Sequence, residues 1–291
     1  AKDETFLRNK IHSLVGVSEH QNLYFNWHKR SIDARKKKIK VNCIFKVSID
    51  EEITNEKFHF NHQDVRQKEE VHIIGMGPAG LFAALYAIQN GMKPVIYERG
   101  KNVRDRRRDL ARLHKEGVVN PESNYCFGEG GAGTYSDGKL YTRSKKKGDV
   151  REVLKALVHF GADKDILVDS HPHIGTNKLP QIITKIRESI LSCGGEIHFN
   201  HRMTDIHFEK SRVDQVVLNE NIQISVQNLI IATGHSARDI YNILDSKGVK
   251  LKAKPFAIGV RVEHTQEFID FVQYGKVNDE YLPPASYKLV S

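Results

Sequence analysis

Cysteine is scarce in this sequence. Its 291 residues include three cysteines, Cys43, Cys126 and Cys193, which lie far apart and form no C-x-x-C pair. This spacing argues against a disulfide framework and against a zinc site, and it favours a reducing cytoplasm as the location. His171 and His173 have no third and fourth ligand near them in the sequence, so we expect no metal centre.

Long hydrophobic runs are also missing. No apolar run reaches the length of about 18 residues that a membrane helix needs. The chain begins Ala-Lys-Asp-Glu instead of with a basic segment followed by an apolar one. The sequence therefore predicts neither a membrane span nor an intact secretory signal. Because 291 residues exceed one average domain, we expect two or three units.

Acidic residues are outnumbered by basic ones. The chain has 45 lysines and arginines against 36 acidic residues, a net charge of +9 at pH 7. The basic residues are concentrated at 99–115, with smaller clusters at 35–38 and 145–147. Such runs can follow a nucleic-acid backbone or hold an acidic substrate, but they more often form a solvated face. Aromatic residues are not interleaved with them, which removes the stacking part of a single-strand platform.

The stretch from residue 71 to residue 80 is the most informative part of the chain. Residues 71–74 form a short apolar run typical of a buried parallel strand, and Gly75, Gly77 and Gly80 come where such a strand turns into a helix. Gly75 allows the tight turn, Gly77 lets a pyrophosphate approach the backbone, and Gly80 lets the helix pack closely on the strand. The following helix points its N-terminus at the turn, which favours a bound phosphate.

A carboxylate follows at the end of the next apolar run. Residues 93–98 predict a second strand that ends in Glu98, which can accept both hydroxyls of an adenosine ribose and would repel a 2'-phosphate. Strand, turn, helix, strand and acid in this order indicate a dinucleotide pocket. A glycine turn in some other βαβ unit is the less favoured interpretation.

Residues 128–133 repeat the glycine spacing without the rest of the motif. Only Asn124-Tyr125-Cys126-Phe127 precedes them, and the polar residues 134–138 follow where a helix should begin. We therefore reject a second Rossmann turn. A segment so poor in side chains is typical of backbone that passes a large flat or anionic group, or of a mobile surface loop. We favour a loop that contacts the cofactor.

Periodicity predicts the remaining elements. Helices are expected at residues 4–14, 104–114, 149–160 and 178–193. Strands are expected at 23–27, 40–47, 196–200, 203–208, 213–218, 223–226 and 256–263. Residues 229–234 read as a buried strand that ends in the small residues Ala232-Thr233-Gly234, where backbone can pass close beside a bound group.

Several of these motifs together resemble a known group of flavoproteins. The first glycine turn, Glu98-Arg99-Gly100 and Ala232-Thr233-Gly234 are similar to the two-dinucleotide-binding-domain flavoproteins related to glutathione reductase. More narrowly, nearly the whole chain resembles the bacterial proteins called FAD-dependent dehydrogenases or NAD(FAD)-utilizing dehydrogenases. The blocks that carry this likeness are residues 30–35, 121–124, 127–140, 172–176, 233–239 and 254–261.

The resemblance implies FAD as the cofactor, with NAD(P)H as a candidate electron donor. It places the glycine turn at the pyrophosphate, Glu98 on the adenosine ribose, and a backbone group of Met203 beside the adenine. The cofactor-binding residues that it implies are Gly75, Gly77, Pro78, Ala79, Gly80, Glu98, Arg99, Gly130, Gly131, Gly133, Met203, Thr233 and Gly234.

The fold that the resemblance implies is α/β with three domains. Residues 1–68 form a small N-terminal α+β domain. Residues 69–165 and 195–245 form a discontinuous Rossmann-like FAD-binding domain with a parallel sheet and a β-meander. Residues 166–194 and 246–291 form part of a mixed-sheet substrate or cap domain. Because family members continue past Ser291, we expect a fragment whose substrate domain is truncated at its C-terminus.

The predicted function is a cytoplasmic, FAD-binding oxidoreductase, a dehydrogenase that acts on an unidentified small molecule. A flavin carries the electrons itself, so no conspicuous triad is required. The polar groups expected nearest the reaction centre are Asp137, Lys139, His173 and His235, although a structural or surface role is favoured for each one taken alone. Two alternatives stay open: an RNA-associated flavoprotein similar to tRNA-modifying ones, and an NAD-dependent dehydrogenase with a single Rossmann unit.

Overall fold

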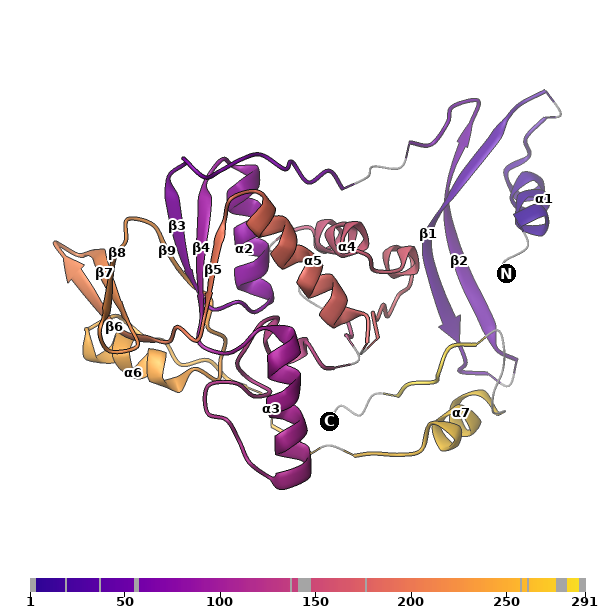
Figure 1. Cartoon of the computed structure of the whole chain (residues 1–291). Coiled ribbons are helices and arrows are strands. Elements are labelled where there is room, and N and C mark those ends of the chain that lie inside the picture. Colours follow the sequence, from indigo (N-terminus) through magenta and orange to yellow (C-terminus); the bar gives the residue numbers. More distant parts are fainter. Residues whose placement is uncertain are drawn as a thin grey trace. The chain divides into compact units, whose positions relative to one another are not determined.

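Four apolar runs form a parallel sheet in the computed structural model. The structure describes residues 4–18, 20–36, 38–54, 58–136, 138–140, 148–175, 177–256, 258–260, 262–275 and 282–287. The strands are β3 (Glu70–Ile74), β4 (Lys93–Glu98), β5 (Glu196–Phe199) and β9 (Leu229–Ile231), in the order β5-β4-β3-β9 (Figure 1). The α/β class and the parallel sheet are thereby confirmed. The predicted burial of β9 is wrong, because β9 is an edge strand and its residues Ile230 and Ile231 are 38% and 37% exposed.

Helices cover one face of this sheet (Figure 1). Helix α2 (Pro78–Gln89) connects β3 to β4, and α5 (Leu179–Ser192) packs beside it with the isoleucines at 182, 183, 186 and 190 buried. That spacing forms one apolar stripe along a helix. Ile73 and Ile96 point from the sheet into the same core. Helices α3 (Val103–Glu116) and α4 (Val150–His159) complete this side.

A β-meander covers the opposite face, as predicted. Strands β6 (Met203–Glu209), β7 (Arg212–Leu218) and β8 (Ile222–Ser225) pair antiparallel, and α6 (Arg238–Ser246) packs on β6. Ile74, Val95 and Tyr97, which alternate along their strands with the residues of the first core, point into this second core. The turn at Lys210 and Ser211 has positive φ at both residues, which suits a two-residue hairpin between twisted strands.

The chain divides into two compact units. Unit 1 comprises residues 1–56, 167–172 and 254–291, and unit 2 comprises residues 57–166 and 173–253. Residues 58–68 and α5, which the prediction assigned to the N-terminal and substrate domains, fall in unit 2 of this division. The physical reason is the apolar core of unit 2, which buries Phe60 and Val65 together with the isoleucines of α5.

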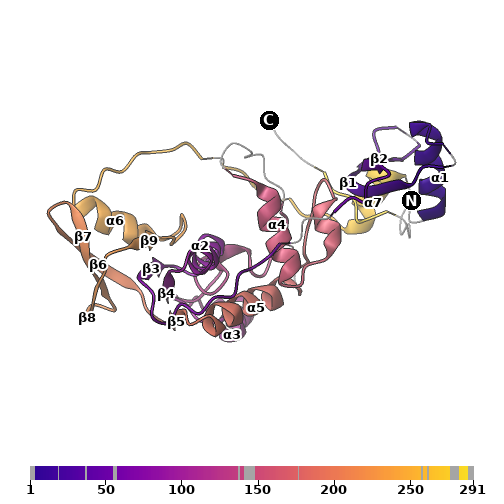
Figure 2. The same cartoon turned by 90° about the horizontal axis from the view of Figure 1, so that it is seen from above.

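Unit 1 is a small α+β unit. It contains α1 (Glu4–Val15), the antiparallel hairpin of β1 (Leu23–Asp33) and β2 (Lys40–Ile49), and α7 (Gln266–Tyr274), all seen from a second direction in Figure 2. A β-bulge interrupts the register between Trp27 and Lys29. A separate core of Ile11, Val17 and Leu23 joins the helix to the hairpin.

The strand predicted at residues 256–263 is wrong. The described residues of this segment adopt no regular structure, and Phe256, Ile258 and Val260 are 83 to 90% exposed. Alternating apolar residues make a strand only where another strand satisfies the backbone N–H and C=O groups, and no described strand pairs with this segment. No helix in the described ranges is long and apolar enough to cross a membrane.

Candidate cofactor site

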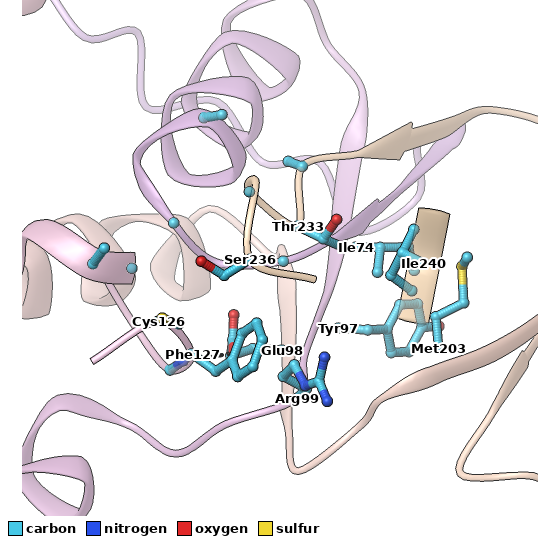
Figure 3. A pocket seen from close by; sticks show the side chains of 18 of the residues that line it. Ile74, Tyr97, Glu98, Arg99, Cys126, Phe127, Met203, Thr233, Ser236 and Ile240 are labelled. Carbon is cyan, nitrogen blue, oxygen red and sulfur yellow. Dashed lines mark hydrogen bonds between the residues drawn. The ribbon is translucent and has the colours of Figure 1, made fainter. Parts of the chain in front are cut away.

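A cavity of about 340 Å³ lies at the carboxyl ends of the parallel strands, all within unit 2. Ligands of open α/β sheets bind at this edge. Five segments line the cavity: the first glycine turn, the end of β4, residues 126–133, residues 201–203 and residues 232–236, with Ile240 from α6 (Figure 3). All five segments contain predicted cofactor residues, and the structure brings them together from positions more than a hundred residues apart.

Two glycines of the first turn are required by the protein itself. Gly75 has φ +102°, and a Cβ there would lie 2.7 Å from the carbonyl oxygen of Ala232. A Cβ on Gly80 would lie 2.0 Å from the carbonyl oxygen of Gly75. Both positions therefore exclude larger residues, because β9 and α2 pack directly on the turn.

Gly77 differs from its neighbours in the turn. Its φ is −73°, which any residue adopts, and the nearest atom that an added Cβ would meet is the Cα of Gly131 at 3.8 Å. Gly77 lines the cavity and is also the N-cap of α2, with no side-chain cap. Pro78 at the first helical position has no N–H, so the first N–H groups without a carbonyl partner in the helix are those of Ala79 and Gly80, and Ala79 lines the cavity. A Cβ at Gly77 would fill space that the protein leaves free.

Glu98 carries a larger structural role than the sequence predicts. Its carboxylate is 4% exposed and accepts three backbone N–H groups, from Met76 at 2.7 Å, Gly100 at 2.8 Å and Gly128 at 2.9 Å. It thereby ties the glycine turn and the loop at residue 128 to the end of β4. Since a carboxylate has about four acceptor positions, one remains for a ligand hydroxyl where the prediction requires two.

Arg99 and an aromatic ring form one wall of the cavity (Figure 3). The Arg99 guanidinium lies 4.0 Å from the ring centre of Phe127 and bonds Glu122 at 2.8 Å and Asp239 at 3.0 Å. Burial alone would lower the pKa of Arg99, but the bonds and charges of both carboxylates raise it above its ordinary value. Arg99 thus stays charged and is held over an aromatic ring.

The other predicted cofactor residues divide into two groups. Met203, Thr233, Gly234, Gly131 and Gly133 line the cavity, as do Pro78 and Ala79. Gly130 does not: its N–H bonds the carbonyl oxygen of Met76 at 2.8 Å, and a Cβ there would meet the side chains of Thr134 and Ile183.

Sequence reasoning missed several residues that line the cavity. They are Ile74, Tyr97, Cys126, Phe127, His201, Arg202, Ser236 and Ile240. Phe127 had a signal in the sequence, since it is an aromatic residue directly before a glycine-rich loop. Residues 131–133 form a short 3-10 helix, η1, which explains why the second glycine run opens no α-helix.

The candidate catalytic residues do not gather at the cavity. Asp137 lies outside the described residues. Lys139 and His173 are both exposed and face each other in an isolated antiparallel bridge away from the cavity lining. His235 does line the cavity. All three cysteines are free, and the described residues hold no cluster of three or more His, Cys, Asp or Glu side chains suited to a metal ion.

Comparison with family models gives three matches. Residues 69–269 match the pyridine nucleotide-disulphide oxidoreductase family. Residues 255–291 match the model described as FAD-dependent protein, C-terminal domain-like. Residues 1–48 match a domain family of unknown function.

Individual proteins show weaker or partial likeness. An uncharacterized protein of Clostridium beijerinckii is 38% identical over 306 residues, which cover 99% of this chain and 57% of that protein, so the chain spans little more than half of this relative. The solved THI4 structure of Thermovibrio ammonificans is 18% identical with a TM-score of 0.42, over 63% of this chain and 64% of that chain. Thioredoxin reductase of Lactococcus lactis is 20% identical with a TM-score of 0.30, over 57% and 36%.

Proposed function

The chain belongs to the pyridine nucleotide-disulphide oxidoreductase family, and on this premise we propose that the cavity of unit 2 holds FAD within a longer dehydrogenase. The family and the match to an FAD-dependent C-terminal domain support the predicted class, an FAD-dependent oxidoreductase. The narrower bacterial dehydrogenase family stays a proposal, as does each residue's contact with the cofactor.

The free space at Gly77 is the observation that carries this proposal. The protein packs tightly around Gly75 and Gly80 but leaves the Cβ position of Gly77 open toward the cavity. The N-terminal amides of α2 and the positive end of its dipole stand at the same place. An anionic diphosphate fits both properties, because it approaches bare backbone and accepts unpaired N–H groups.

The rest of the lining supports an adenosine beside that diphosphate. Glu98 keeps one acceptor position for a ribose hydroxyl, and Arg99 with Phe127 offers a flat cationic and aromatic wall for a base. Thr233 and Gly234, in the run of small residues that follows β9, border the other side. We propose that the backbone at Met203 contacts the adenine.

When bound, FAD supplies the electron-transfer chemistry, and the chain's own residues bind it, orient it and limit its access to water. We propose NAD(P)H as the electron donor and a small molecule as the substrate. In the described part of the chain, the first glycine turn opens the helix of a βαβ unit and the second glycine run does not. We therefore propose that NAD(P)H binds and leaves in each reaction cycle and is not a second resident cofactor of unit 2.

Purified protein is expected to bind FAD. Titration of the full chain with FAD should quench the flavin fluorescence and give a bound flavin absorption spectrum, and NADH titrated into the same preparation should bind more weakly. The same titration on a longer polypeptide, of the length of the Clostridium beijerinckii relative, distinguishes a site that binds FAD weakly in this chain from the absence of an FAD site. Tight NADH binding without FAD binding in both proteins would instead support the single-Rossmann NAD-dependent dehydrogenase.

Replacing Arg99 with alanine is expected to weaken FAD binding about tenfold, which corresponds to about 1.4 kcal/mol. The change removes the cation over Phe127 and leaves Glu122 and Asp239 without this partner beside the cavity. The FAD dissociation constant at two salt concentrations measures the effect. Arg104→Ala, an exposed arginine of α3, is the control and should bind FAD like the natural protein. Equal affinity of both variants would remove Arg99 from the proposed site.

A further inference from the structure

One arginine of the basic segment is buried. Arg106 is 0% exposed, whereas Arg104, Arg107 and Arg108 on the same helix are exposed to solvent. Arg106 follows Val103 by three residues and precedes Leu110 by four, so it lies on the apolar stripe of α3. A fully buried arginine away from the surface needs a specific set of partners.

The hydrogen-bond acceptors of its side chain all belong to the glycine loop, which we define as residues 124–134, and the guanidinium also lies over the ring of the next residue, Tyr135. The Arg106 Nε donates to the carbonyl oxygen of Asn124 at 2.9 Å, and Nη2 donates to that of Tyr125 at 3.1 Å. Nη1 donates to the carbonyl oxygen of Glu129 at 2.8 Å and to the Oγ1 of Thr134 at 3.1 Å. The guanidinium therefore binds the start, the middle and the end of one loop.

The backbone of the glycine loop is shaped around this side chain. A Cβ on Gly128 would lie 2.5 Å from the Cδ of Arg106, and Gly128 has φ +116°. Glycine at this position is thus required by the passage of Arg106 and by the backbone conformation. The side chain and the glycine form one fitted unit.

The glycine loop also forms part of the cofactor cavity. Cys126, Phe127, Gly128 and Gly131 line it. The N–H of Gly128 bonds Glu98, and the N–H of Gly130 bonds the carbonyl oxygen of Met76 in the glycine turn. The loop is therefore held between the glycine turn on one side and Arg106 on the other.

A second buried side chain anchors the same loop. Glu129 is 0% exposed, and its Oε2 accepts the N–H of Val103 at 2.7 Å and the Nη1 of Arg187 at 2.7 Å. Burial raises the pKa of Glu129. Helices α3 and α5 thus both hold the loop from the side of the helical core.

We propose that Arg106 is a positioning residue for the cofactor: it holds the glycine loop against the glycine turn, so that the walls on both sides of the diphosphate are formed before FAD binds. This proposal rests on the proposed function, since it takes FAD as the ligand of the cavity. A preformed wall lowers the ordering cost that binding must overcome. Arg106 itself does not line the cavity.

The test compares Arg106→Lys with Arg107→Lys in the full chain. Lysine keeps the charge, but its compact ammonium cannot span acceptors that are spread along the loop. We expect the FAD dissociation constant to rise at least about tenfold in Arg106→Lys and to stay unchanged in Arg107→Lys, whose side chain is exposed. Thr134→Val, which removes one partner of Arg106 at nearly constant volume, should shift the constant in the same direction by less and serves if Arg106→Lys does not fold.

A second readout reports the loop without FAD. In Arg106→Lys, amide hydrogen exchange should accelerate more at Gly128 and Gly130 than in α2 or α5. Cys126 of the loop should also react faster with a thiol reagent than in the natural protein. A purely structural role would move exchange throughout unit 2 equally. Normal FAD affinity and normal loop exchange in a folded Arg106→Lys protein would overturn the positioning role. Failure of both the natural chain and a polypeptide of the relative's length to bind FAD, with the loop exchange effect present, would overturn the proposed function and leave Arg106 as a residue that only holds the loop.

Discussion

Replacing Gly77 with alanine is expected to abolish FAD binding by a protein that still folds. The backbone at Gly77 suits any residue, and an added Cβ would meet no described protein atom nearer than 3.8 Å. The methyl group would instead occupy the space that we assign to the diphosphate. We therefore expect the FAD dissociation constant to rise at least about a hundredfold, or about 2.7 kcal/mol, with little change in stability.

Contrasting variants on the same turn and helix make this result interpretable. Gly80→Ala should unfold unit 2, because its Cβ would lie 2.0 Å from the carbonyl oxygen of Gly75. Tyr86→Ala, at a residue of α2 that is 69% exposed, should change neither FAD binding nor folding. Folding is followed by thiol modification of Cys193, which is 4% exposed in the core of unit 2. Undiminished FAD binding by Gly77→Ala would contradict the assigned position of the diphosphate.

The local elements could be predicted because their signals lie within short windows. The apolar runs of β3 and β4 and the stripe of isoleucines on α5 appear in the structure within one or two residues of the predicted bounds. The glycine turn was predictable for the same reason, since its geometry depends on residues 75–80 and on the helix that they open. The cavity then follows from the rule that parallel strands end at one edge.

The long-range contacts of the site could not be predicted in this way. Glu98 binds the amide of Gly128, thirty residues away, and no local pattern marks that bond. Arg106 is different, because helical spacing from Val103 places it on the buried stripe, although its basic neighbours conceal the signal. The segment at 256–263 shows the converse error, an alternating pattern for which no described strand supplies the pairing partner.

Replacing Glu98 with alanine is expected to lower the stability of unit 2 as well as its affinity for FAD. The change leaves the buried N–H groups of Met76, Gly100 and Gly128 without their acceptor. Since each such loss costs about 1 to 3 kcal/mol, we expect the free energy of unfolding to fall by about 4 kcal/mol. In Glu98→Gln the free energy of unfolding should fall by about half as much. The amide keeps one acceptor oxygen, but its NH2 group faces backbone N–H donors at the position of the second carboxylate oxygen.

The measurement must report unit 2, and the single tryptophan cannot do so because Trp27 lies in β1 of unit 1. Urea-dependent protection of the Cys193 thiol in protein without FAD gives the unfolding free energy of the correct unit. Glu188→Gln, at an exposed position of α5, is the matched control and should change stability by less than about 0.5 kcal/mol. If Glu98→Ala lost FAD binding but kept full stability, the carboxylate would serve the ribose alone. We expect Glu98→Ala to lose both stability and FAD affinity, because Glu98 accepts three backbone N–H groups and keeps one acceptor position for the ribose.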